Sequence, residues 1–130
     1  MTLSETGVGS TIHTIPIYGR RLEIEFDPHM KQNEKIYAVQ CGTCAFVSTT
    51  PDNKIWMCFS VQSLCHSVVA HEAVHAAWRI LALAGVKFDE DNHEAFAYLV
   101  GYITNLVWLD IHRYNKLMES WEDPMADTGN

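Results

Sequence analysis

The sequence is poor in positive charge and has no long uninterrupted hydrophobic stretch. Lysine and arginine together number 9 against 16 aspartates and glutamates, which gives a net charge of −7 for 130 residues. A chain this acidic is repelled by a nucleic-acid backbone and by an anionic membrane surface, so neither is expected as the main partner. Charged or polar residues interrupt each apolar stretch, and we therefore expect no membrane span.

The first residues also lack the pattern of a secretory signal. Met1–Ser10 is polar and has no apolar centre, so we expect no signal peptide and a cytoplasmic protein, in the host cytoplasm if a phage encodes it. The length fits one domain covering residues 1–130, and the 48% hydrophobic content can build one core. Met1–Thr11 and residues 119–130 are expected to be loosely ordered.

A second Cys-x-x-Cys pair is lacking as well. Of the four cysteines, Cys41 and Cys44 form one such pair, whereas a zinc knuckle needs two. A redox Cys-x-x-Cys normally begins a helix, but the residues after Cys44 are β-prone. We therefore expect reduced, partly buried thiols, with a structural four-cysteine zinc site as the alternative.

The chain does contain two kinds of hydrophobic periodicity, one after the other. Arg21–Phe26 alternates apolar and charged residues, and β-prone segments flank the turn-forming residues Pro51-Asp52-Asn53. The expected strands are Ile12–Tyr18, with Pro16 indicating a sheet edge, Arg21–Phe26, Ile36–Gln40, Cys44–Thr50 and Lys54–Phe59. The sequence thus predicts an α+β fold in which a small antiparallel sheet of about 3–5 strands precedes two long helices.

Two helical segments follow the strands. Ser63–Ala84 contains neither proline nor glycine, and Gly85 is suited to end that helix in a left-handed conformation. The second helix is expected to begin at Asp91 or Asn92 and to continue to about Met118. Gly101 is expected to let the two helices approach closely.

The first helix contains an HExxH motif, His71–His75. Residues four apart lie on one side of a helix, so His71 and His75 can bind one zinc ion while Glu72 lies beside them. In this arrangement zinc lowers the pKa of a water molecule to about 7 and Glu72 acts as the general base. The alternative interpretation is a core helix with two surface histidines.

A third ligand is required, and the candidate segment is Asn92–Tyr98 at the start of the second helix. Here the sequence resembles the gluzincins, in which a downstream glutamate, often within E-x-x-A-D, completes the zinc site. The resemblance implies that Glu94, not the adjacent His93, is the third ligand of one Zn²⁺ per chain. This chain has Tyr98 where those families have the aspartate, so the partner that orients the histidines is unassigned.

The two segments also look similar to small hypothetical proteins of bacteriophages and prophages. The shared patterns are HE-x-x-HAAW-x-IL and DN-x-EA-x-AYLVGY, within roughly residues 60 to 107. We therefore expect a zinc-dependent hydrolase, specifically a minimal metallopeptidase that acts on a peptide or protein substrate. Tyr98 is the first candidate to stabilise the developing oxyanion, followed by His93 and His66.

Two other functions stay open. One is a deformylase-like amidase whose third ligand is a cysteine, for which Cys44, Cys58 and Cys65 are candidates. The other is an interaction module that keeps the zinc site without turnover. The remaining histidines, His13, His29 and His112, fit no pattern and are expected at the surface.

Overall fold

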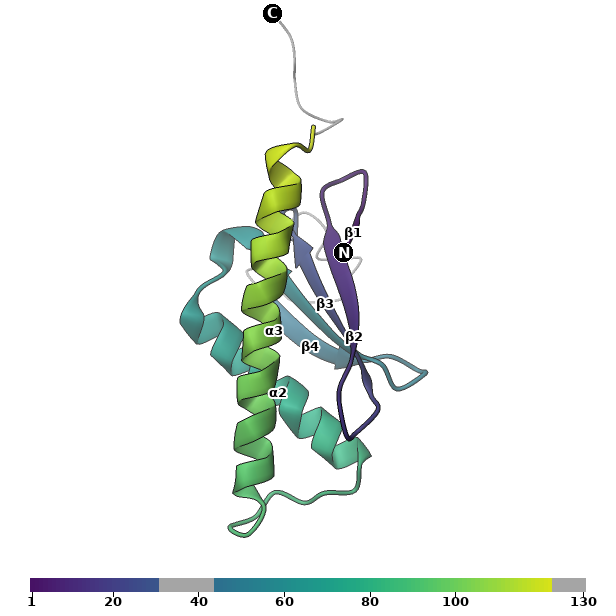
Figure 1. Cartoon of the computed structure of the whole chain (residues 1–130), viewed down its shortest axis with the longest axis vertical. Helices are drawn as coiled ribbons and strands as arrows, with labels where there is room; N and C mark the ends of the chain where they lie inside the picture. The colour runs from purple at the N-terminus through teal and green to yellow at the C-terminus, as the bar shows by residue number, and fades with distance from the viewer. Residues whose placement is uncertain (31–43, 123–130) are drawn as a thin grey trace, which may run out of the picture.

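The computed structural model describes residues 1–30 and 44–122. Figure 1 shows the long helix α3 running beside a sheet, with α2 crossing it. The elements in chain order are β1 (Thr2–Leu3), β2 (Gly9–Thr14), β3 (Arg21–Asp27), β4 (Ala45–Thr49), β5 (Ile55–Ser60), the 3₁₀ turn η1 (Val61–Ser63), α2 (His66–Leu83) and α3 (His93–Glu119). The expected α+β class, a small sheet followed by two long helices, is confirmed.

The sheet is mixed, whereas the sequence predicted an antiparallel one. Its strand order is β1-β2-β3-β5-β4, and the predicted hairpin of β4 and β5 is present. β5, not β4, pairs with β3, and this pair is parallel, with Leu22 opposite Ile55 and Phe26 opposite Phe59. The alternation of apolar and polar residues within a strand does not reveal which strand of a hairpin lies next to the rest of the sheet. The pairing of β5 with β3 was therefore not predictable from the sequence.

The first strands differ from their expected bounds. β2 ends at Thr14, and Pro16 lies in the following turn, where the Tyr18 amide donates a hydrogen bond to its carbonyl oxygen at 2.8 Å. The expected strand Ile12–Tyr18 was therefore wrong in its second half. Residues 1–11 were expected to be loosely ordered, yet Thr2–Leu3 pairs with β2. The predicted strand Ile36–Gln40 and Cys41 lie outside the described residues.

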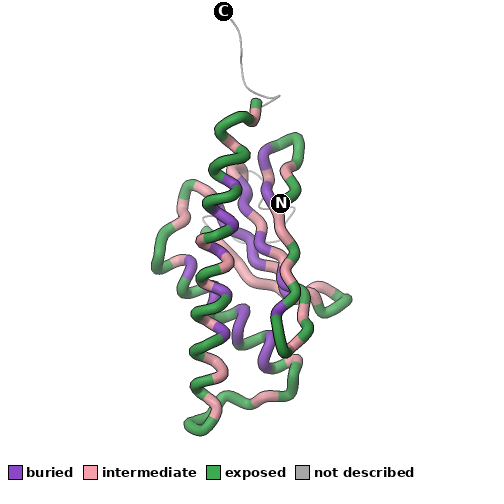
Figure 2. Tube along the Cα trace, viewed as in Figure 1, coloured by how far each residue is buried: buried purple, intermediate pink, exposed green. Residues whose placement is uncertain are grey.

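The core lies between one face of the sheet and the two helices. Alternate side chains of β3 and β5 point to this face and are fully buried, as the purple segments of Figure 2 show along the facing elements. They are Leu22, Ile24, Phe26, Ile55, Met57 and Phe59, and they form one cluster with residues of α2 and α3. This packing holds α2 against β4 and β5 and therefore fixes which residues of the HExxH helix are exposed.

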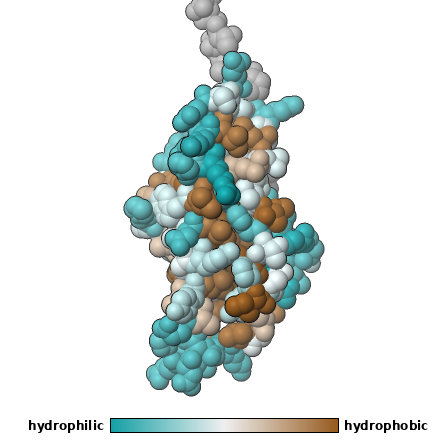
Figure 3. Space-filling model, viewed as in Figure 1, coloured by the Kyte–Doolittle hydropathy of each residue, from teal (hydrophilic) through white to brown (hydrophobic). Residues whose placement is uncertain are grey.

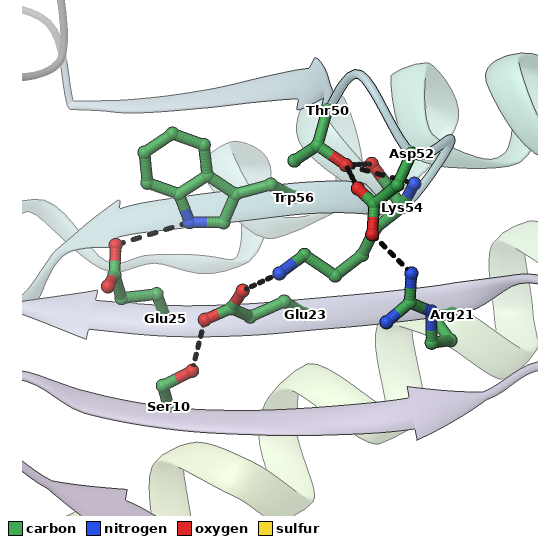
Figure 4. A network of polar contacts seen from close by, with 8 residues as sticks. All are labelled: Ser10, Arg21, Glu23, Glu25, Thr50, Asp52, Lys54 and Trp56. Atoms are coloured by element: carbon green, nitrogen blue, oxygen red, sulfur yellow. Dashed lines mark hydrogen bonds and ion pairs between the residues drawn. The ribbon is translucent and has the colours of Figure 1, made fainter.

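The opposite side of the sheet carries a polar network, drawn in Figure 4. Glu23 accepts a hydrogen bond from Ser10 at 2.6 Å and forms an ion pair with Lys54 at 2.8 Å. Burial acts to raise the pKa of Glu23, but these two partners hold it below its ordinary value. The indole of Trp56 donates to Glu25 at 3.2 Å. These contacts tie β2, β3 and β5 together across the sheet.

Two contacts anchor the second half of α3 to the first strands. The buried Tyr114 hydroxyl donates to the carbonyl oxygen of Gly7 at 2.7 Å. His13 Nε2 lies 2.7 Å from Oδ2 of the fully buried Asp110. His13 was expected at the surface, and this was wrong. Its side chain faces α3, where Asp110 is the one acidic residue among the buried residues described for that helix.

Candidate metal and catalytic site

The two motif histidines lie on the exposed side of α2 and point toward each other. Their ring centroids are 4.8 Å apart, and the two Nε2 atoms are separated by 3.2 Å. The opposite side of the helix is buried, with Val69, Ala73 and Ala76 in the core. The hydrophobic periodicity of α2 thus places the histidine pair at the surface, with the two Nε2 atoms close to each other.

Glu72 occupies a different environment from its neighbours. Its exposure is 8%, and its Oε1 lies 4.0 Å from His71 Nε2. Burial raises the pKa of the Glu72 carboxyl above its ordinary value, although the adjacent imidazoles of His71 and His75 act to lower it. A carboxylate that takes up a proton more readily is better suited to general-base chemistry near neutral pH.

A hollow of about 360 Å³ adjoins these residues at the start of β4. It is lined by Cys44, Ala45, Ser67, Val68, His71 and Glu72. At the other end of β4, Arg79 Nη1 of α2 donates to Thr49 Oγ1 at 3.0 Å. β4, the last strand in the order of the sheet, therefore runs alongside the helix that presents the histidines.

The structure does not bring Glu94 to the histidine pair. Glu94 is 75% exposed at its side chain, and its Oε1 lies 3.9 Å from His93 Nδ1. It lines a separate hollow of about 480 Å³ together with Tyr98, Gly101 and Asn105. Tyr98, which is 77% exposed, shares the side of Glu94 as expected, but this side faces away from the core.

Gly101 does not have its predicted role. A Cβ atom added there would meet nothing within 4 Å, so the missing side chain is not needed for a close approach of the helices. The residues of α3 that contact the core are Leu99, Ile103 and Val107, on another side of the helix. The prediction was wrong because it placed the side of Glu94 against α2.

Within residues 1–30 and 44–122, no group of three or more histidine, cysteine or acidic side chains is arranged to hold a metal ion. Of the three predicted ligands, the structure brings His71 and His75 together, and a metal site that includes them and Glu94 stays a prediction. Of the three cysteines considered, Cys44 shares a hollow with His71. Cys58 is buried on β5 and donates to Glu25 on the far side of the sheet.

Cys65 and His66 stand at the beginning of α2. Cys65 is the residue before the helix, where a hydrogen bond from Ser67 lowers the pKa of its thiol. His66 packs on Trp108 of α3 with ring centroids 4.6 Å apart. His93, the other candidate besides Tyr98 for stabilising an oxyanion, is exposed next to Glu94. Cys65, His66 and His93 are not among the residues that line the hollow of His71 and Glu72.

An aromatic cluster that was not predicted from the sequence lies beside the candidate site. Trp78 is 52% exposed and contacts Phe88 and Phe96, with ring centroids 5.3 Å and 6.0 Å away. Trp78 follows His71 by seven residues and His75 by three, a spacing that places all three on one side of the helix. This spacing was a readable signal in the sequence.

Comparisons with protein-family models, curated proteins and solved structures find no match for this chain. Neither long helix, nor any other helix within the described ranges, has the length and apolar character needed to cross a membrane.

Proposed function

We propose that this protein is a zinc-dependent hydrolase of the metallopeptidase type, with His71 and His75 as ligands and Glu72 as the general base. The observation that carries this proposal is the convergence of the two imidazoles. Two nitrogen ligands of one tetrahedral zinc ion, each about 2.0–2.1 Å from it, are separated by about 3.3 Å. The observed separation of the Nε2 atoms, 3.2 Å, agrees with this value.

The chemistry of the donor set also fits. Neutral imidazoles are common zinc ligands, and a bound ion supplies a Lewis acid for a carbonyl group and for water. Glu72 acts as the general base: its carboxylate, which is 8% exposed, takes a proton from water and later returns it to the leaving amine.

The position of β4 supports a peptide substrate. β4 ends the strand order of the sheet and begins beside His71 and Glu72. An extended peptide can add to such an edge through main-chain hydrogen bonds, which fixes its backbone while side chains point alternately to either face. A peptide bound along β4 passes the histidine pair at the start of the strand.

The amidase with a cysteine ligand is the second candidate function, and one observation favours it. Cys44 lines the hollow that contains His71 and Glu72, whereas Glu94 lines another. We retain Glu94 as the proposed third ligand of a metallopeptidase, on the resemblance of its segment, and Cys44 as its competitor. Comparing the zinc affinities of Glu94→Ala, His93→Ala and Cys44→Ser separates the two.

The experiment that tests the function combines metal analysis with peptide hydrolysis. The wild type is expected to retain about one zinc per chain when purified without chelator. Glu72→Gln should keep this zinc and lose hydrolysis, because an amide cannot accept the proton, while His75→Ala should lose the metal. Near-normal turnover by Glu72→Gln would refute the general-base role. Zinc binding without hydrolysis by the wild type would instead favour an interaction module.

A further inference from the structure

An aromatic pocket lies next to the proposed site, at the end of α2. Trp78 of α2, Phe88 of the connection between the helices and Phe96 of α3 contact one another, and the Phe88–Phe96 ring centroids are 4.9 Å apart. Together with Leu81, Ala82 and Val86 they line a hollow of about 540 Å³. We call this hollow the aromatic pocket.

Two of the three rings remain largely accessible. Trp78 is 52% exposed and Phe88 is 48% exposed, although both are large apolar side chains. Exposed aromatic groups that border a concave surface are typical of binding sites, because filling the surface removes the remaining apolar area from water. The pocket is large enough to take any single amino-acid side chain.

An ordered loop holds Phe88 in this position. Oδ1 of Asp89 accepts hydrogen bonds from the backbone amides of Asp91 and Asn92 at 2.8 Å and 3.0 Å. The Asn92 side chain donates to the carbonyl oxygen of Lys87 at 2.8 Å. These hydrogen bonds fix the backbone on both sides of Phe88, so the loop conformation holds the Phe88 ring in its half-exposed position.

The aromatic pocket and the histidine pair share one side of α2. His71, His75, Trp78 and Ala82 follow one another at intervals of four, three and four residues, so they form a single stripe along the helix. At 1.5 Å per residue, Trp78 lies about 4.5 Å along the axis from His75. When a peptide bond of a substrate lies at the histidine pair, the side chain of the residue next to that bond can therefore reach the aromatic pocket.

The surroundings of the aromatic pocket are acidic. Asp89, Glu90 and Asp91 are all exposed and directly follow Phe88, while Lys87 is the one cation among the residues that line the pocket. Figure 3 shows hydrophilic side chains gathered at the end of the molecule where this connection lies. The net charge of −7 has the same sign, so this end attracts basic groups.

We propose that the aromatic pocket binds a large apolar side chain of the substrate peptide, and that a basic residue beside this side chain strengthens binding. The substrate class is thus a peptide in which an aromatic or long aliphatic residue lies next to a lysine or arginine. This inference rests on the proposed function, since the histidine pair places the peptide backbone. Trp78 is the residue that determines the preference.

The test measures binding separately from turnover. Two peptides, Ala-Ala-Phe-Lys-Ala and Ala-Ala-Ala-Lys-Ala with blocked ends, are titrated into zinc-loaded Glu72→Gln protein and followed by NMR at the Trp78 indole signal. The phenylalanine peptide should bind about ten-fold more tightly, the size expected for burying part of one aromatic side chain. Replacing its lysine with glutamate should weaken binding about two- to three-fold at low salt.

Variants identify the pocket as the cause. Trp78→Ala, followed by fluorescence of an N-terminally labelled peptide, should remove the ten-fold difference while leaving the zinc content unchanged. Leu109→Ala, which truncates another exposed apolar residue on α3, should keep the difference. If Trp78→Ala lowers the yield of folded protein, Phe88→Leu is a milder change in the same pocket. It should reduce the difference in affinity between the two peptides.

The outcomes separate this inference from the proposed function. Equal affinity for the two peptides would overturn the aromatic pocket as a binding site, even if the wild type hydrolyses both. An unchanged difference in Trp78→Ala and Phe88→Leu would overturn it as well. A difference that depends on Trp78, with no hydrolysis by the wild type, would support the pocket and refute the proposed hydrolase.

Discussion

The close contact between Gly9 and Tyr114 leads to a quantitative prediction about how α3 is held on the sheet. Tyr114 is 1% exposed, and its ring packs against Phe26 with centroids 5.5 Å apart while its hydroxyl binds Gly7. A Cβ atom at residue 9 would lie 2.4 Å from Cδ2 and 2.9 Å from Cε2 of this ring. Gly9→Ala should therefore be strongly destabilising.

The magnitude follows from what must move. Carbon atoms in contact prefer a separation of about 3.5–4.0 Å, so the Tyr114 ring would have to shift by about 1 Å or more. Such overpacking typically costs about 1–3 kcal/mol. The shift also endangers the hydrogen bond to Gly7, whose loss adds about 0.5–1.5 kcal/mol. We expect the free energy of unfolding to fall by about 2–4 kcal/mol, a large part of the usual total.

Urea unfolding followed by fluorescence measures this change. The control is a double-mutant cycle, because Gly9→Ala should cost clearly less in a Tyr114→Leu background, where the ring atoms are gone. Tyr114→Phe, which removes only the hydroxyl, should cost about 0.5–1.5 kcal/mol. A change below about 0.5 kcal/mol for Gly9→Ala, or the same cost in both backgrounds, would refute the proposed contact.

Two further substitutions test other parts of the sheet. Glu25→Gln should raise stability at neutral pH, because burial, with Glu23 and Asp27 nearby, raises the pKa of Glu25 above its ordinary 4.5. The folded wild type then binds the proton more tightly, so its stability falls as pH rises above about 4.5, and the advantage of Gln should vanish near pH 4 in thermal melts. Ile17→Gly should raise the free energy of unfolding by about 0.5–1 kcal/mol. Ile17 has φ 72°, and the backbone strain that glycine removes there exceeds the conformational entropy that glycine adds to the unfolded chain. Little packing is lost, because the Ile17 side chain is 97% exposed. A loss of stability in urea unfolding would contradict the second prediction.

Much of the fold was predictable because its signals are local. The apolar residues of α2 recur at helical spacing, and Gly85 ends the helix with φ 75° as expected. The hairpin of β4 and β5 follows from Pro51-Asp52-Asn53 between two β-prone segments. The parallel pairing of β3 with β5 depends on contacts between distant segments, for which the strand pattern contains no signal.

Of the candidate site, too, the features that depend on local sequence were predictable, and those that depend on contacts between distant segments were not. The convergence of His71 and His75 follows from their spacing on one helix, and the structure reproduces it. The burial of Glu72 depends on how α2 rests on the sheet, and the position of Glu94 depends on the rotation of α3. That rotation is set by the buried residues Leu99 to Tyr114, so an error of one residue turns a side chain by about 100°.

The rotation of α3 yields a final prediction about the third ligand. Glu94 precedes the buried Leu99 by five residues, which places its side chain about 140° around the helix from that of Leu99. Glu94 can therefore join His71 and His75 only if the first turn of α3 rearranges, whereas Cys44 already lines the hollow of His71. Zinc titration followed by NMR distinguishes them. Coordination by Glu94 should shift the backbone amides of His93 to Phe96, and Glu94→Gln should abolish these shifts. Coordination by Cys44 should shift the amides at the start of β4 and leave α3 unchanged. Shifts confined to His71 and His75 would refute both ligands.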